Sequence, residues 1–147
     1  MKIGKLDTAS LGRPIIVAEM SANHLGRLER ALEIIDAAAG SGADALKIQT
    51  YRADTITIRS DRPEFRIRGG LWDGRSLYDL YEEGTTPWEW IPALIERGRK
   101  NGLEVFSSPF DAGAAAVLEK NGVPAFKIAS FELVDLGLIR AVSAYRK

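Results

Sequence analysis

The chain has 147 residues, 46% of them apolar, and its 20 basic and 20 acidic residues give a formal net charge of zero. This balance, without any block of like charges, argues against a nucleic-acid partner or an anionic membrane surface, and no apolar run is long enough to span a membrane. Cysteine is absent and His24 is the only histidine, which excludes disulfides and a multi-histidine metal site within this chain and fits a cytoplasmic protein.

The first part of the chain is predicted to form an arm and then two strands with a helix between them. Residues 1–13 are interpreted as the arm. Residues 14–20 are predicted as a buried strand because a continuous apolar run fills them. Residues 28–39 are predicted as a helix because their apolar residues recur at helical spacing. A second strand is predicted over residues 44–50.

A long irregular connection follows over residues 51–86, and a connection of this length inside a compact domain is usually functional. Thr86 and Pro87 predict an N-cap and a first helical residue for the next helix, which runs to Lys100. The other predicted elements are a short helix over 76–83, a strand over 103–107, a helix over 111–121 capped by Asp111, a strand over 125–129, and a helix over 136–145 capped by Asp135.

Strands that alternate with helices predict an α/β fold with a parallel sheet and right-handed crossovers. A TIM (β/α)8 barrel typically takes ~250 residues. Four β/α units over residues 14–147 would make half of such a barrel. An open sheet, a paired half-barrel and a truncated protein are the alternatives.

Two strand-like runs place a lysine among apolar residues, at Lys47 and at Lys127. A lysine inside a buried strand loses hydration worth several kcal/mol unless it meets an anion. The two lysines therefore suggest a site for a small, highly charged anionic substrate. The alternative is a pair of core lysines neutralised by Glu19 and Glu132. Alternation along the strands directs one set of side chains to the barrel interior, namely Val17, Glu19, Lys47, Gln49 and Lys127.

Four motifs at the predicted strand ends follow one another along the chain: Ala18-Glu19-Met20-Ser21-Ala22-Asn23-His24, Lys47-Ile48-Gln49-Thr50, Phe106-Ser107-Ser108-Pro109-Phe110 and Lys127-Ile128-Ala129-Ser130-Phe131-Glu132. In this order and spacing they resemble the sialic acid synthase family, whose members condense phosphoenolpyruvate with an N-acylated sugar to give a nine-carbon nonulosonic acid. The stretch Leu71-Trp72-Asp73-Gly74, together with Leu77-Tyr78 and the later Thr86-Pro87-Trp88-Glu89-Trp90, looks closer to the pseudaminic acid branch. The N-acetylneuraminate and legionaminate branches are the alternatives.

The resemblance implies roles for individual residues. It assigns phosphoenolpyruvate binding to Lys47, Ser108, Lys127 and Ser130. It assigns sugar binding to Glu19, Asn23, Gln49 and Trp72. The catalytic residues that it implies are Glu19, Lys47 and Lys127. Purely structural roles stay open for Asn23, His24, Trp72 and Ser107, and Glu19 could simply pair with Lys47. Trp88 and Trp90 are expected to pack against the core.

The resemblance also implies parts that this chain does not contain. The family barrel has eight units, so the resemblance implies that residues 14–147 are the amino-terminal half of a TIM (β/α)8 barrel, with about four β/α units. The family protein continues into a small antifreeze-like domain, and it uses a divalent metal (typically Mn, with Mg or Co as alternatives) held by two histidines of the second half. We therefore expect no metal ligands in this chain, inactivity in isolation, and unpaired strand edges. Such edges favour a homo-oligomer or a complementary half-barrel. The alternative function class is a non-catalytic half-barrel that only binds the anion.

Overall fold

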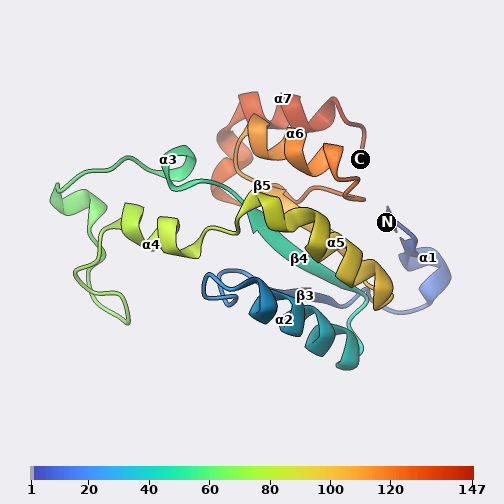
Figure 1. Ribbon diagram of the computed structural model, residues 1–147. Helices are drawn as coiled ribbons and strands as arrows, with labels where there is room; N and C mark the ends of the chain where they lie inside the picture. The colour runs from blue at the N-terminus through green and yellow to red at the C-terminus, as the bar shows by residue number, and fades with distance from the viewer. Residues whose placement is uncertain (1) are drawn as a thin grey trace.

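The computed structural model describes residues 2–147 and shows a parallel sheet whose outer face is covered by helices (Figure 1). The strand order is β3-β4-β5, with β3 at Val17–Glu19, β4 at Ala45–Thr50 and β5 at Glu104–Pro109. The main helices are α2 (Leu28–Gly40), α4 (Leu77–Gly84), α5 (Ile91–Lys100), α6 (Ala112–Lys120) and α7 (Leu136–Ser143). Within the described residues, no helix has the length and apolar character needed to cross a membrane. The predicted α/β class is confirmed.

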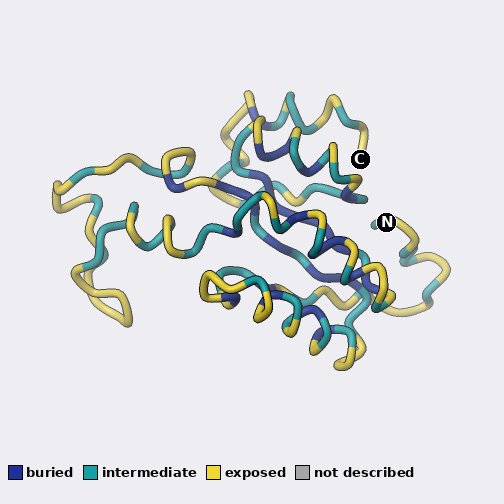
Figure 2. Tube along the Cα trace, in the orientation of Figure 1, coloured by how far each residue is buried: buried dark blue, intermediate teal, exposed yellow. Residues whose placement is uncertain are grey.

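The core lies between the outer face of the sheet and the helices. Leu46 and Ile48 of β4 are fully buried, as are Ile35 of α2 and Leu94 of α5. Helix α5 approaches β5 so closely that a Cβ on Gly98 would lie 2.2 Å from Cγ2 of Val105. Figure 2 shows the same division, with most of β4, β5 and the inner helix faces buried, whereas β3 is largely exposed.

The first strand is shorter than predicted. It begins at Val17, because the N–H of Ile16 is engaged by a side chain and only the Ile16 carbonyl bonds to the backbone of residues 44 and 45. The backbone N–H of Ile16 donates to the Asp44 carboxylate at 2.8 Å, and Arg13 holds the same carboxylate through hydrogen bonds of 2.6 and 2.7 Å. The preceding Pro14 has no N–H to offer a ladder.

The fourth strand predicted over residues 125–129 does not form as a strand. Phe126 makes one parallel bridge with Ser107 of β5, and the N–H of Lys127 donates to the Ser107 carbonyl at 3.0 Å. Within residues 2–147 the segment has β5 as its only sheet neighbour, which leaves its other side without a ladder. The short helix η3 (Phe131–Val134) follows directly and draws the chain away from the sheet.

The amino-terminal arm is more regular than predicted. It forms a hairpin from β1 (Lys2–Ile3) and β2 (Leu6–Asp7), followed by the single turn α1 (Thr8–Leu11). The N–H of Lys5 donates to the Glu104 carboxylate at 2.9 Å, so the hairpin is tied to the start of β5. In Figure 1 this arm lies at the opposite end of the sheet from the long connection.

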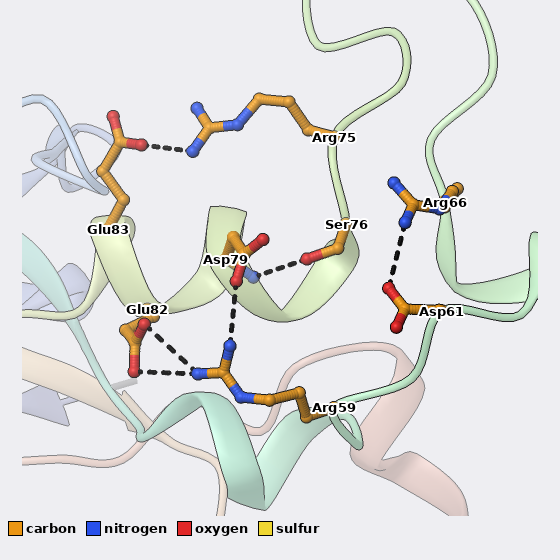
Figure 3. Close-up of polar contacts among 8 residues, drawn as sticks. All are labelled: Arg59, Asp61, Arg66, Arg75, Ser76, Asp79, Glu82 and Glu83. Carbon is orange, nitrogen blue, oxygen red and sulfur yellow. Dashed lines mark hydrogen bonds and ion pairs between the residues drawn. The ribbon is translucent and has the colours of Figure 1, made fainter.

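The long connection projects from the carboxyl ends of the strands (Figure 1). It contains α3 (Ala53–Ile56), η1 (Pro63–Phe65) and α4, and we refer to residues 51–86 as the insert. Figure 3 shows that ion pairs brace it. Arg59 reaches Asp79 at 3.2 Å and Glu82 at 3.4 Å, Arg66 reaches Asp61 at 3.0 Å, and Arg75 pairs with Glu83.

Most helix starts agree with the predicted caps. The Asp111 carboxylate accepts from the N–H of Ala114 at 2.9 Å, and the Asp135 carboxylate accepts from the N–H of Leu138 at 3.0 Å. The prediction for Thr86 and Pro87 was wrong, because the short helix η2 (Trp88–Trp90) follows Pro87 and α5 begins only at Ile91. The Thr86 hydroxyl bonds instead to His24.

Candidate active site

The strand register places the predicted site residues of β3, β4 and β5 on the inner face of the sheet. Glu19 lies opposite Lys47, and Gln49 lies opposite Ser108. Side chains alternate along a strand, so these residues point away from the helix-covered face. Lys127 follows Phe126, the partner of Ser107, and so lies on the same face as Ser108.

Glu19 and Lys47 form an ion pair between their neighbouring strands. The Lys47 side chain is 17% exposed and that of Glu19 is 39% exposed, so the cation is the more buried partner. The other carboxylate oxygen of Glu19 accepts from the N–H of Ser21 at 3.1 Å. The pairing of Glu19 with Lys47, which was the alternative to sugar binding, is therefore present, and it partly neutralises a cation that faces the barrel interior.

The two consecutive serines of β5 have opposite environments. Ser107 lies on the outer face, where its hydroxyl is 2.8 Å from the hydroxyl of Thr50 and donates to the Ile48 carbonyl at 3.1 Å. Ser108 is only 1% exposed, and its hydroxyl has no hydrogen-bond partner among the described residues. A buried hydroxyl without a partner is costly. The geometry makes Ser107 a structural hydroxyl and leaves the Ser108 hydroxyl unsatisfied within the described residues.

Lys127 and Ser130 are exposed, so the prediction of a buried lysine at position 127 was wrong. The segment that carries them pairs with the sheet at a single bridge and is not covered on its far side by any described residue of a further strand. Lys127 makes no ion pair with residues 2–147, and one carboxylate oxygen of Glu132 is buried there without a partner. The alternative in which Glu132 neutralises Lys127 is therefore not seen within this part of the chain.

A cavity of about 520 Å³ lies between the carboxyl end of the sheet and the insert. Three of the four residues predicted to bind sugar line it, namely Asn23, Gln49 and Trp72. Glu19, the fourth, is not among the lining residues, because its carboxylate is turned to Lys47 and Ser21. Trp72 is 49% exposed and lies on the insert side of the cavity. The structure thus brings residues that follow β3 and β4 together with residues of the insert around one cavity.

The cavity wall contains a pair of tyrosines that the sequence did not single out. Tyr51 is buried and contacts Tyr81 edge-on, with ring centroids 6.2 Å apart, and Phe110 with centroids 5.5 Å apart. Burial, with a smaller contribution from Tyr81, raises the pKa of Tyr51 to about 12. Its position two residues after Gln49 was the available signal, because alternation directs both side chains to the same face. This aromatic contact fastens α4 to the sheet.

The side chains of the loop after β3 have structural partners. The side-chain amide of Asn23 donates to the Met20 carbonyl at 2.8 Å. His24 is fully buried: its Nδ1 accepts from the N–H of Gly26 at 3.1 Å, and its Nε2 lies 3.2 Å from the Thr86 hydroxyl. Since Nδ1 accepts, Nε2 carries the proton and donates to Thr86. Burial lowers the pKa of His24 and keeps the ring neutral.

The described residues do not fit a metal site. No group of three or more His, Cys, Asp or Glu side chains in residues 2–147 is arranged to hold a metal ion. Both ring nitrogens of His24 are already engaged in hydrogen bonds.

Comparison with known proteins places this arrangement among carbohydrate synthases. Residues 34–147 match the sequence model of the NeuB family. The chain is 46% identical over 147 residues to the pseudaminic acid synthase of Campylobacter jejuni, covering 100% of this chain and 42% of that protein. It is 47% identical over 134 residues to the pseudaminic acid synthase of Helicobacter pylori, covering 91% of this chain and 39% of that protein. The chain thus spans about two fifths of the length of these relatives.

A solved structure supports the fold over almost the whole chain. The N-acetylneuraminic acid synthetase of Leptospira borgpetersenii, crystallised in complex with citrate, superposes with a TM-score of 0.79 at 26% identity. The superposition covers 99% of this chain and 46% of that protein. The α/β units described above therefore correspond to somewhat less than half of that structure.

Proposed function

The chain belongs to the NeuB family, and from this premise we propose that it carries the substrate-binding face of a pseudaminic acid synthase. The observation that carries the proposal is the 46% identity to a pseudaminic acid synthase along the full chain. The shared inner face of Lys47, Gln49 and Ser108 supports it. The reaction proposed is the condensation of phosphoenolpyruvate with an open-chain 2,4-diacetamido-trideoxyhexose.

In this reaction, the methylene carbon of phosphoenolpyruvate attacks the sugar aldehyde and forms the new carbon–carbon bond. The aldehyde oxygen takes up a proton and becomes a hydroxyl. Water then adds at the resulting cationic carbon, and phosphate leaves with the oxygen that joined it to that carbon. The products are a nine-carbon keto acid and inorganic phosphate.

The inner face suits the anionic substrate. We assign Lys47, Ser108, Lys127 and Ser130 to phosphoenolpyruvate, because ammonium and hydroxyl donors match its phosphate and carboxylate. The unpartnered hydroxyl of Ser108 is the strongest structural support, since a phosphate or carboxylate oxygen would satisfy it. Positive charge near the developing anion would then lower the barrier.

The adjoining cavity suits the sugar. We assign Glu19, Asn23, Gln49 and Trp72 to this substrate, with Gln49 joining the two sites because it lies opposite Ser108 and also lines the cavity. A partly exposed tryptophan can stack on the apolar face of a sugar ring or on an acyl group. The aldehyde would then lie at the boundary between the two sites.

The proposed reaction needs barrel units and a metal site that this chain does not supply. Because the chain spans about two fifths of the length of its pseudaminic acid synthase relatives, we propose that activity requires further barrel units, supplied by a longer protein, a complementary half-barrel or a homo-oligomer. We assign no residue of this chain to the divalent metal that the family resemblance implies. We propose the cytoplasm as the compartment.

The binding proposal is tested by calorimetric titration of phosphoenolpyruvate into the 147-residue chain and its variants. Lys47→Gln and Lys127→Ala should each weaken binding by at least about tenfold, which is the loss of one charge-assisted hydrogen bond of ~1.5 kcal/mol or more. Lys120→Gln on α6 removes the same charge away from the inner face and serves as the control. Equal affinity for all four proteins would overturn the assignment.

A non-catalytic anion-binding module is the second candidate, and the inner face that carries Lys47 and the unpartnered Ser108 hydroxyl suits such a module equally well. It differs from the first in turnover and not in binding. Joining this chain to the rest of the C. jejuni relative should give activity if the chain is a synthase portion. Phosphoenolpyruvate binding without product in that chimera would favour the module.

A further inference from the structure

The Glu19 carboxylate has two partners that belong to two different sites. One oxygen pairs with the ammonium of Lys47, which we assign to phosphoenolpyruvate. The other accepts from the N–H of Ser21 at 3.1 Å, and Ser21 lines the cavity assigned to the sugar. A single side chain thus connects the two substrate sites, and we call its two contacts the Glu19 latch.

The loop that the latch holds is strained. Ser21 has φ = 50° and Leu25 has φ = 50°, both in the left-handed region that side chains other than glycine rarely adopt. Both residues line the cavity. Such a conformation persists only where neighbouring contacts impose it, and the Glu19–Ser21 hydrogen bond is one such contact. A change at Glu19 is therefore transmitted to the cavity wall.

An anion at Lys47 would disturb the latch. A phosphate or carboxylate on that ammonium brings a second negative charge beside the Glu19 carboxylate, and like charges within a few ångströms disfavour one another. The low exposure of Lys47 limits how much water can screen them. The incoming anion and Glu19 thus compete for one cation.

We propose that phosphoenolpyruvate opens the Glu19 latch: anion binding at Lys47 displaces the Glu19 carboxylate, which releases the Ser21 loop and turns toward the cavity. This inference rests on the proposed function of the site. The displaced carboxylate becomes an acceptor for the hydroxyl or amide groups of the sugar. The two substrates then bind with positive coupling, each favouring the state that the other needs.

The test combines calorimetry with hydrogen exchange on the 147-residue chain. In the wild type, phosphoenolpyruvate should accelerate exchange of the Ser21 amide, because its acceptor has moved away. Glu19→Gln should bind phosphoenolpyruvate about fivefold more tightly or better, the lower end of typical coupling between sites. In the same variant, exchange at Ser21 should no longer respond to phosphoenolpyruvate.

A matched control separates the latch from a general effect of charge. Glu33→Gln on the exposed side of α2 removes the same charge, and it should leave both the affinity and the Ser21 response as in the wild type. Glu19→Ala provides a second variant should Glu19→Gln fold poorly, and circular dichroism checks both.

The outcomes distinguish the latch from the proposed function. If the wild type binds phosphoenolpyruvate but Ser21 exchange does not change, the latch is overturned and the function stands. If only Glu19→Gln binds within the accessible concentration range, the latch is supported, because removal of the competing carboxylate has freed Lys47. If neither protein binds, both the latch and the assigned anion site are overturned.

Discussion

The hydroxyl of Tyr51 lies directly against the backbone of Gly84, so closely that a Cβ built on Gly84 would be 2.8 Å from the hydroxyl oxygen. Tyr51 follows β4 and Gly84 ends α4, so this contact joins the sheet to the insert. Both residues line the 520 Å³ cavity. The absence of a side chain at position 84 is therefore what allows the insert to close the cavity.

The variant Gly84→Ala should push α4 away from Tyr51. Overpacking of this kind typically costs ~1–3 kcal/mol, and we expect a loss of that size in the free energy of unfolding, measured with urea. The sugar should bind more weakly, while phosphoenolpyruvate affinity should change little. Gly40→Ala at the end of α2, where a Cβ meets nothing within 4 Å, is the control. It should be neutral or stabilising by ~0.5–1 kcal/mol.

Ser107 and Ser108 should respond in opposite ways to replacement by alanine. Ser107→Ala removes hydrogen bonds to Thr50 and to the Ile48 carbonyl and should destabilise the fold by ~1–3 kcal/mol. Ser108→Ala removes a hydroxyl without a partner among the described residues, so stability should be unchanged or higher. Its phosphoenolpyruvate affinity should fall. A Ser108→Ala protein with reduced stability and unaltered affinity would contradict the assignment.

Much of the fold was predictable because local signals agreed with tertiary packing. The caps Asp111 and Asp135 and the helical apolar spacing of α2 are encoded within a few residues. The errors came from contacts distant in sequence. Thr86 looks like a cap but bonds to His24, 62 residues earlier. The apolar run around Lys127 predicts a strand, yet this segment makes a single bridge to β5 before η3 turns the chain away from the sheet.

The sequence predicts which face the strand residues of the candidate site share, but it does not predict how the cavity beside them is closed. Alternation places Lys47 and Gln49 on the same face, and the register agrees. The cavity wall contributed by Tyr81 could not be predicted, because nothing local indicates that α4 folds back onto Tyr51. The Glu19–Lys47 pair was weighed as an alternative to sugar binding, and the structure shows the pair itself.

His24 should make stability depend on pH in mildly acidic conditions. Burial lowers its pKa in the folded state below the ordinary value of 6.5, so the unfolded chain binds more protons as the pH falls through that value. The free energy of unfolding should therefore decrease as pH drops below about 6.5 and level off below the folded-state pKa. Urea unfolding between pH 7 and pH 5 measures this, and His24→Gln should flatten the curve. An unchanged slope in the variant would exclude His24 as its source.

Two aspartates should govern stability at lower pH. Hydrogen bonds from Arg97 and then from Asn101 lower the pKa of Asp36 to about 2, and hydrogen bonds from Arg13 and then from the N–H of Ile16 lower that of Asp44 to about 2. Their stabilisation is complete above the ordinary pKa of 3.8 and is lost as pH falls toward 2.

The acid-unfolding midpoint reports on these pairs. Asp36→Asn and Asp44→Asn should each move the midpoint to higher pH at fixed urea, because the stabilising carboxylate is gone. Glu96→Gln on α5 is a suitable control, since its exposed carboxylate has no ion pair within residues 2–147. A midpoint shift as large for Glu96→Gln as for the aspartate variants would contradict the role of the pairs.

The most direct test of the synthase proposal is turnover by the chimera that joins this chain to the rest of the C. jejuni relative, supplied with phosphoenolpyruvate and the 2,4-diacetamido-trideoxyhexose. Mass spectrometry should detect a nine-carbon keto acid formed together with one equivalent of phosphate. The chimera carrying Lys47→Gln should form none. A folded chimera that binds phosphoenolpyruvate but releases neither phosphate nor a condensed product would contradict the account.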